Sequence, residues 1–101
     1  MNEYAKNYYG HLADLMNSVK FISNERNNID FYDGIGMVGN LILTQANSGH
    51  KLMFIGNGAS AAISSHMSTD FWKTCGIRAI AFNDSSLLTC LGNDFGYEYI
   101  F

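Results

Sequence analysis

The chain has 101 residues, a net charge of −3, 48% hydrophobic residues and 15% charged residues. This composition is typical of one small globular domain. The sequence has no basic cluster, no apolar run near the ~20 residues of a membrane span and no signal-peptide pattern, so we expect neither nucleic acid nor a membrane as partner. Two cysteines without an obvious pairing are typical of the reducing cytoplasm, where we expect the protein to act.

The first fifty residues predict two helices. Apolar side chains recur at steps of three and four over residues 4–22, which gives one apolar stripe along about five helical turns. Residues 24–28 are polar and indicate a break, and a second helix is predicted over residues 30–46. Three glycines weaken the second helix, each by up to ~1 kcal/mol relative to alanine: Gly34, Gly36 and Gly39. They indicate either close helix packing across a subunit contact or simply a poor helix, and the sequence leaves both interpretations open.

The second half of the chain predicts a strand–helix–strand unit followed by a short helix. The expected elements are a strand over 52–55, a helix over 59–74, a strand over 77–82 and a short helix over 86–91. Both strands are nearly continuous apolar runs, which is typical of parallel strands covered on both faces. A strand, a helix and a parallel strand form one right-handed crossover unit. Asp84 or Ser85 is placed to cap the short helix.

The turn between the first strand and its helix carries the main chemical signal. It reads Gly56-Asn57-Gly58-Ala59-Ser60. Glycines let a ligand approach the main chain, and the helix that follows points unpaired N–H groups and its positive dipole end at the loop. The pattern therefore predicts a site for phosphate or another anion. It also satisfies the dinucleotide-binding fingerprint, and a tight turn without a ligand would look the same.

A second signal lies within the predicted helix. His66 and Asp70 are four positions apart and so lie on one helical face. An imidazole and a carboxylate placed in this way can converge on one metal ion or one substrate. Taken alone, the pair is more commonly an exposed ion pair than a metal site.

The loop resembles the Gly-Asn-Gly-Gly-Ser loop of the sugar isomerase (SIS) domain family, in its phosphoheptose isomerase branch. A second block, residues 92–97 with the sequence Gly-Asn-Asp-Phe-Gly-Tyr, is similar to that family's Gly-Asn-Asp-(Phe/Tyr)-Gly element. The resemblance covers the whole chain. It implies that residues 1–101 are the N-terminal part of a single SIS domain of the α/β class. Residues 1–50 would form a helical segment, and residues 51–101 the first βαβ unit of a flavodoxin-like parallel sheet, truncated near its middle.

The resemblance also implies an activity. This branch converts sedoheptulose 7-phosphate to D-glycero-D-manno-heptose 7-phosphate, for the heptose of bacterial lipopolysaccharide or capsule. Asp70 would be the catalytic carboxylate near the reacting carbons, and His66 with Asp70 would be zinc ligands, as in the zinc-containing members. The family also implies a homotetramer whose first helices pack together. The residues expected to bind the sugar phosphate are Asn57, Gly58, Ala59, Ser60, Asn93 and Asp94.

Two departures from the family pattern weaken the expectation of catalysis. The family has a glutamate where this chain has Asp70, and the shorter side chain can draw the carboxylate back by ~1.5 Å. Ala59, which replaces a glycine, is a milder change. The family completes its site with a serine-rich loop after a third strand and with a glutamine and a histidine from a late helix. None of these is within the 101 residues, so we expect this chain alone to be inactive.

Two alternatives remain from the sequence. The first is a non-catalytic SIS module that binds a sugar phosphate or a protein partner, which Asp70 and the missing groups favour. The second is a fragment of a dinucleotide-binding oxidoreductase, in which Asp84 would bind the ribose. The second explains the glycines, but such folds open with their glycine-rich strand rather than with two helices.

Overall fold

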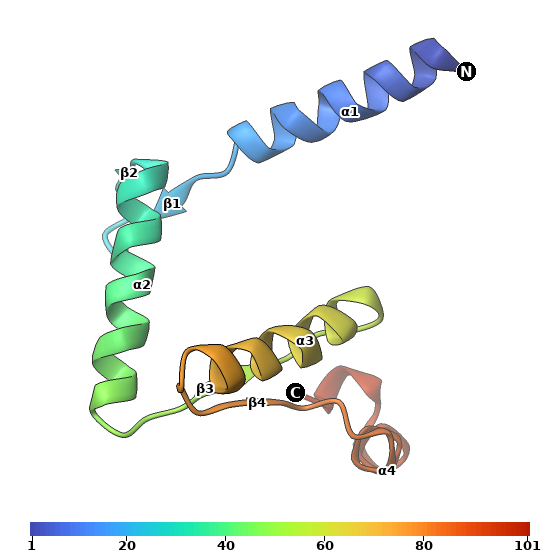
Figure 1. Ribbon diagram of the computed structural model, residues 1–101. Coiled ribbons are helices and arrows are strands. Elements are labelled where there is room, and N and C mark those ends of the chain that lie inside the picture. The colour runs from blue at the N-terminus through green and yellow to red at the C-terminus, as the bar shows by residue number, and fades with distance from the viewer. The chain divides into compact units, whose positions relative to one another are not determined.

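The computed structural model describes all residues from Met1 to Phe101 and confirms an α/β chain (Figure 1). It contains four α-helices, one short 3-10 helix and two two-stranded sheets. The residues divide into two compact units, Met1–Leu41 and Ile42–Phe101, and the boundary falls inside the second α-helix. None of the helices combines the length and the apolar character needed to cross a lipid bilayer.

The first unit begins with helix α1 (Asn2–Asn17) and continues into a small antiparallel hairpin, β1 (Phe21–Ile22) and β2 (Asn28–Ile29). The prediction that one helical stripe continues to residue 22 is therefore wrong. Ser18 ends α1, because its N–H bonds to carbonyls of the last turn and its hydroxyl donates to the Leu15 carbonyl at 2.8 Å. Aromatic and β-branched residues then favour strand over helix.

The polar residues after β1 form the turn of this hairpin rather than a simple break. The N–H of Ser23 donates to the Asn27 carbonyl at 3.0 Å, and the N–H of Arg26 donates to the Ser23 carbonyl at 2.9 Å. Arg26 has a φ of 63°, which lets the chain reverse its direction. The hairpin returns the chain directly to the start of α2.

Helix α2 (Phe31–Asn47) confirms the second predicted helix to within one residue at each end. The Asp30 carboxylate begins it by accepting from the N–H groups of Tyr32 and Asp33, at 2.9 and 3.3 Å. A Cβ atom on Gly34 would lie 2.2–2.7 Å from the ring of Phe21 in β1. Close approach of the hairpin therefore requires this glycine, whereas Gly36 and Gly39 have no neighbour within 4 Å. Packing of glycines across a subunit contact stays a prediction.

The second unit contains the predicted parallel strand pair. Strands β3 (Leu52–Phe54) and β4 (Ala79–Ala81) pair in parallel, with Leu52 opposite Ala79, and helix α3 (Ala59–Thr74) connects them. The bounds of α3 are those predicted, but both strands are shorter than expected. Helix α3 packs against both strands. The opposite face is open, with Met53 and Ile80 exposed, because one helix covers only one face of the strand pair.

The chain ends with helix α4 (Ser85–Phe95) and the 3-10 helix η1 (Tyr97–Tyr99). Helix α4 continues four residues beyond its predicted end at residue 91. Gly96, with a φ of 96°, then turns the chain into η1. The two helices pack against each other, and Ile100 behind them is buried. This arrangement returns the C-terminal residues toward the rest of the second unit.

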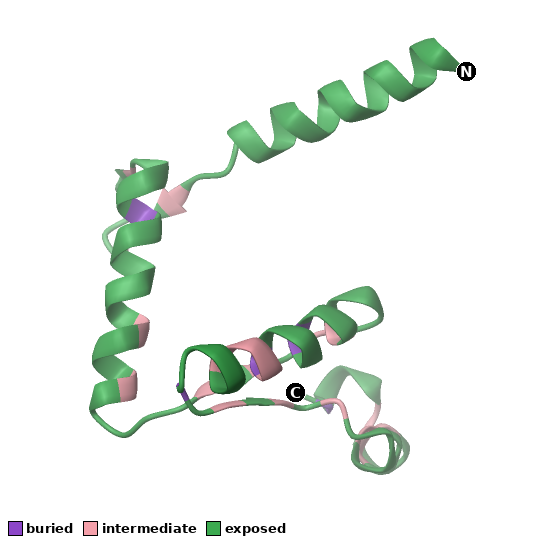
Figure 2. Ribbon diagram, viewed as in Figure 1, coloured by how far each residue is buried: buried purple, intermediate pink, exposed green.

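Little apolar surface is buried in either unit. Ile77 and Ile100 are the buried hydrophobic residues, and no residue of α1 is buried, so that helix is exposed throughout in Figure 2. The aromatic contact between Phe54 of β3 and Phe71 of α3 joins helix to sheet, with ring centroids 5.7 Å apart. The apolar stripe predicted for α1 is thus exposed and has no partner within the first unit.

Candidate functional site

The loop between β3 and α3 has a shape that only its glycines allow. A Cβ atom on Gly56 would lie 2.6 Å from the carbonyl carbon and oxygen of Ser60, closer than real Cβ atoms come to backbone. Gly58 is the N-cap of α3 and has a φ of 58° and a ψ of −123°, a conformation that residues with a side chain rarely adopt. The strand end therefore passes directly over the first turn of the helix.

The Ser60 hydroxyl holds this loop closed. It donates to the Asn57 carbonyl at 2.7 Å and accepts from the Asn57 N–H at 2.9 Å. The Ser60 N–H bonds to the same carbonyl at 3.2 Å. The N–H groups of Gly58 and Ala59 have no hydrogen-bond partner in the structure. Two free donors therefore lie at the positive end of α3, as an anion site requires.

One exposed face of α3 runs from these donors to the predicted carboxylate. Ala59, Ile63, His66 and Asp70 follow one another at steps of four, three and four residues, so they share a helical face. The opposite face of α3 packs against the sheet. There Ser64 is buried, and its hydroxyl donates to the carbonyl of Ile55, directly after β3, at 3.1 Å. Ala59, which follows the N-cap Gly58, and Asp70 are thus about 16 Å apart along the helix axis.

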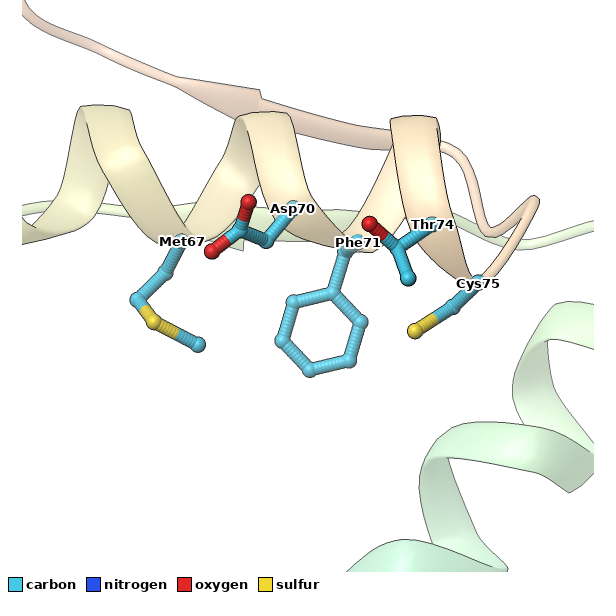
Figure 3. A pocket seen from close by; sticks show the side chains of 5 residues that line it. All are labelled: Met67, Asp70, Phe71, Thr74 and Cys75. Atoms are coloured by element: carbon cyan, nitrogen blue, oxygen red, sulfur yellow. The ribbon is translucent and has the colours of Figure 1, made fainter.

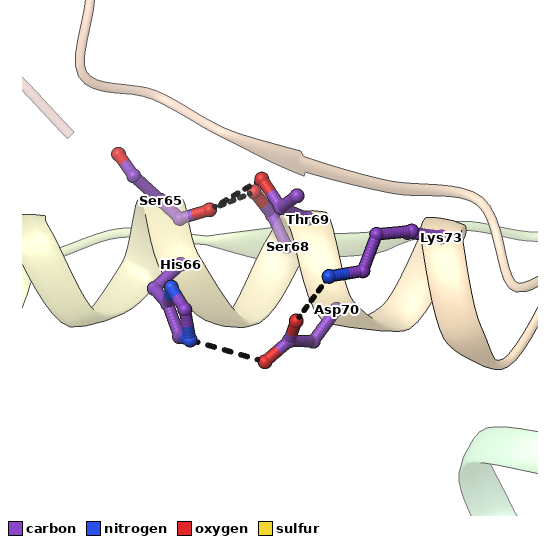
Figure 4. Close-up of polar contacts among 6 residues, drawn as sticks. All are labelled: Ser65, His66, Ser68, Thr69, Asp70 and Lys73. Carbon is purple, nitrogen blue, oxygen red and sulfur yellow. Dashed lines mark hydrogen bonds and ion pairs between the residues drawn. The ribbon is translucent and has the colours of Figure 1, made fainter.

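Asp70 contacts a histidine and a lysine on this face (Figure 4). Its Oδ2 lies 3.2 Å from His66 Nε2, and its Oδ1 lies 3.4 Å from Lys73 Nζ. The side chain of His66 is 76% exposed and that of Asp70 39%. The predicted histidine–carboxylate pair is therefore formed, but a lysine that the sequence analysis did not consider also holds the carboxylate. The spacing of Asp70 and Lys73, three residues, was the signal for it.

The residues of this face do not make a complete zinc site. A catalytic zinc ion takes three protein ligands and a water. His66 and Asp70 supply two donors of suitable type, and no group of three His, Cys, Asp or Glu side chains in the chain is placed to hold a metal ion. The pair therefore fits as a partial ligand set only.

A shallow hollow of about 290 Å³ lies beside Asp70. Its lining is largely apolar, and Asp70 is its one ionisable carboxylate; the residues around it are Met67, Asp70, Phe71, Thr74 and Cys75 (Figure 3). In Figure 3 these side chains project from the same side of α3. The carboxylate is thus next to a small apolar surface and not in a deep pocket.

Asn93 and Asp94 lie together in the last turn of α4. The Asn93 Nδ2 donates to Asp94 Oδ1 at 3.0 Å, and the Cys90 thiol donates to Asp94 Oδ2 at 3.5 Å. No hydrogen bond or ion pair joins this pair to the glycine loop or to Asp70. The predicted site residues therefore form three separate groups: the glycine loop, the His66–Asp70 pair and the Asn93–Asp94 pair.

Tyr97 links two of these regions, and the sequence analysis did not identify it. Its hydroxyl donates to Oδ1 of Asn57 at 3.0 Å, across 40 positions of sequence.

Asn83, which follows β4, is a second residue that was missed. Its Nδ2 donates to the Ala61 carbonyl and to the Ser65 hydroxyl, at 2.6 and 2.7 Å, while its Oδ1 is buried without a partner. Neither contact leaves a signal in residue spacing.

Asp84 is the N-cap of α4 and not a free acid at the end of β4. Its carboxylate accepts from the N–H groups of Ser86 and Leu87 at 3.0 and 3.1 Å, and from the Ser86 hydroxyl. The Ser86 hydroxyl, then the Leu87 N–H, hold the pKa of Asp84 below its ordinary value. These bonds occupy the group that the dinucleotide interpretation assigned to a ribose.

Comparison with known proteins gives the same family that the two motifs resemble. No family model matches the chain. It is 31% identical over its whole length to a phosphoheptose isomerase of Akkermansia muciniphila and 33% identical over its whole length to phosphoheptose isomerase 2 of Campylobacter jejuni. A phosphoheptose isomerase of Geotalea uraniireducens is 38% identical over 66% of the chain.

The matched share of these relatives is limited. The alignments cover 52%, 50% and 39% of the three proteins, so the chain spans about half the length of the curated relatives it matches. Identity over the full chain, together with the glycine loop and the Asn93–Asp94 element in their predicted order, identifies the family. The chain belongs to the phosphoheptose isomerase family of SIS-domain proteins and corresponds to the N-terminal part of its members.

Proposed function

We propose that this chain provides the sugar-phosphate-binding part of a phosphoheptose isomerase, which interconverts sedoheptulose 7-phosphate and D-glycero-D-manno-heptose 7-phosphate. The observation that carries the proposal is the pair of free N–H groups on Gly58 and Ala59, at the N-terminus of α3. The names of the relatives, all phosphoheptose isomerases, supply the class of substrate.

The free N–H groups bind an anionic oxygen of the substrate, and the helix dipole adds to the attraction. The Asn57 amide lies beside them and donates to a sugar oxygen. Asn93 and Asp94 bind sugar hydroxyls from the end of α4. These amide and carboxylate groups can exchange hydrogen bonds with the hydroxyl groups of a sugar, and all three residues are exposed in the structure.

Asp70 is the carboxylate of this chain available to move a proton between adjacent carbons of the substrate. Aldose–ketose isomerisation needs such a base and a group that polarises the carbonyl or enediol. Asp70 lies on the same helical face as His66 and beside the shallow apolar hollow. If zinc takes part, His66 and Asp70 are the ligands from this chain, and zinc would supply the polarisation.

A non-catalytic SIS module that binds a sugar phosphate or a protein partner is the second candidate. The observation that favours it is the Lys73–Asp70 contact at 3.4 Å, since the lysine and the histidine between them occupy both carboxylate oxygens. The homotetramer, the cytoplasmic location and the role in lipopolysaccharide or capsule heptose synthesis are further proposals that rest on the resemblance to the family.

The anion site can be tested by replacing one of its two donors. Ala59 is the first residue of α3, where proline fits a helix and removes only the N–H. Ala59→Pro should weaken binding of both sedoheptulose 7-phosphate and inorganic phosphate by at least about 10-fold, because a hydrogen bond to a charged group contributes ~1.5–3 kcal/mol. Affinities follow from amide chemical shifts of residues 56–61 during NMR titration.

Ser85→Pro is the matched control. Ser85 is the first residue of α4, after the Asp84 cap, so the change removes an equivalent N–H from the other helix of the same unit. It should leave phosphate affinity unchanged. Equal weakening by both variants, or shifts that cluster near Asp84 and respond to NAD instead of sugar phosphate, would contradict the proposal.

A further inference from the structure

Tyr97 makes a hydrogen bond that joins the C-terminal 3-10 turn to the glycine loop. Its hydroxyl donates to Asn57 Oδ1 at 3.0 Å, although the two residues are 40 positions apart and both are exposed. An exposed tyrosine would ordinarily satisfy its hydroxyl with water. The contact instead joins the end of the chain to the residue that lies next to the free N–H groups of the anion site.

The geometry of the chain around Tyr97 places its hydroxyl there. Gly96, with a φ of 96°, redirects the chain after α4, and residues 97–99 form a single 3-10 turn. After this turn Ile100 is buried at 8% exposure, and a Cβ atom on Gly92 in α4 would lie 3.9 Å from its Cγ2. The 3-10 turn is therefore packed on α4, and from it the Tyr97 side chain reaches Asn57.

The chemistry of the amide gives this contact a consequence. A carboxamide has an acceptor end and a donor end that are nearly equal in shape, so a free asparagine can present either to a ligand. The Tyr97 hydroxyl occupies the oxygen of Asn57. Its Nδ2 makes no hydrogen bond in the structure, so the side chain offers its donor end to the solvent side of the loop.

We infer that Tyr97 is a positioning residue, which holds the Asn57 side chain beside the free N–H groups in the arrangement that the structure shows, with Oδ1 bonded to the tyrosine and Nδ2 free to donate to a sugar oxygen of the bound phosphosugar. The inference rests on the proposed function for the class of ligand. Tyr97 itself need not touch the ligand. The phosphate is bound by the N–H groups of Gly58 and Ala59, so Tyr97 acts on recognition of the sugar and not of the phosphate.

The test is Tyr97→Phe, which removes the hydroxyl and keeps the ring. Affinity for sedoheptulose 7-phosphate should fall by about 2- to 10-fold, the effect of one neutral hydrogen bond, while affinity for inorganic phosphate stays unchanged. A general loosening of the loop would weaken both ligands equally. In the ligand-free chain the two Nδ2 proton resonances of Asn57 should move toward the shifts of an unrestrained, solvated asparagine side chain.

Tyr99→Phe is a closely matched control. Tyr99 lies in the same 3-10 turn, is 67% exposed where Tyr97 is 66%, and its hydroxyl makes no hydrogen bond. It should change none of these measurements. In the background of Asn57→Ala, Tyr97→Phe should have no further effect on sugar-phosphate affinity, because the group it positions is gone.

Three results would overturn the inference. They are equal effects of the two tyrosine variants, equal loss of both ligands in Tyr97→Phe, and an undiminished effect of Tyr97→Phe in the Asn57→Ala background. If the parent chain binds no sugar phosphate, the proposed function fails. The inference is then decided by the ligand-free Asn57 resonances, which must differ between Tyr97→Phe and Tyr99→Phe for Tyr97 to be a positioning residue.

Discussion

At the scale of single residues, Asp84 shows how one carboxylate both begins a helix and makes that helix depend on pH. It accepts from two backbone N–H groups and one hydroxyl in the first turn of α4. These bonds favour the charged form in the folded chain, which lowers its pKa below 3.8. The stabilisation is therefore complete above the unfolded pKa and is lost as the pH falls through the lower folded value.

Replacing Asp84 by asparagine should remove this pH dependence. Asparagine is as good an N-cap as aspartate but does not titrate. During acid titration by NMR, the amide resonances of Ser86 and Leu87 should move in one step below pH 3.8 in the parent chain and stay level in Asp84→Asn. Asp33→Asn, which alters the first turn of α2, should leave that step unchanged. A step of equal size in Asp84→Asn would show that another group causes it.

At the scale of elements, the hairpin packs closely against α2 because Gly34 has no side chain. The ring of Phe21 occupies the space where a Cβ atom of Gly34 would be. A buried glycine in a helix lowers the stability of the helix itself, so its presence here is explained by the packing that it allows. The other two glycines of α2, Gly36 and Gly39, have open space around them and no such reason within the chain.

Two alanine variants separate these roles. Gly34→Ala should lower the free energy of unfolding by ~1–3 kcal/mol, because the new methyl group must displace an aromatic ring. Gly36→Ala should raise it by up to ~1 kcal/mol, because alanine is the better helix former and nothing lies within 4 Å of it. Urea unfolding curves give both values. Stabilisation by Gly34→Ala would mean that Phe21 does not pack there in solution.

Elements dominated by local signals could be predicted from the sequence. The bounds of α3 follow from the glycine loop before it and the residues that end it, and they match to the residue. The hairpin could not, because apolar residues at 19 and 22 continue the helical spacing of α1 equally well. Tyr97–Asn57 could not either, since a contact between side chains 40 positions apart depends on how α4 and η1 pack.

At the scale of the whole chain, the dominant feature is apolar surface without a partner. Helix α1 buries no residue, although its stripe carries several large apolar side chains at 44–77% exposure: Tyr4, Tyr8, Leu12 and Leu15. The open face of the β3–β4 pair is a separate exposed apolar surface in the second unit. Contiguous exposed apolar surface is typical of protein contacts, so we expect the chain to associate.

The association should depend on the α1 stripe. The double variant Leu12→Glu and Leu15→Glu should shift the chain toward its monomer mass of 11.2 kDa, measured by light scattering over a range of concentrations. Ala13→Glu with Asn17→Glu adds the same charge to the opposite face of α1 and should leave association unchanged. A parent chain that is a clean monomer with a cooperative thermal transition would contradict this expectation.

The weak attachment of the last two helices has a thermodynamic consequence. Helices α4 and η1 pack chiefly on each other, and the polar tie from η1 to the glycine loop is a hydrogen bond between exposed groups, whose net stabilisation is ~0.5–1.5 kcal/mol. We therefore expect residues 84–101 to open locally at a small free-energy cost, without unfolding of the βαβ unit. A ligand that binds only the closed form stabilises it by about 2.7 kcal/mol at a hundred times its Kd. The fraction of molecules in which residues 84–101 are closed then depends chiefly on the ligand concentration.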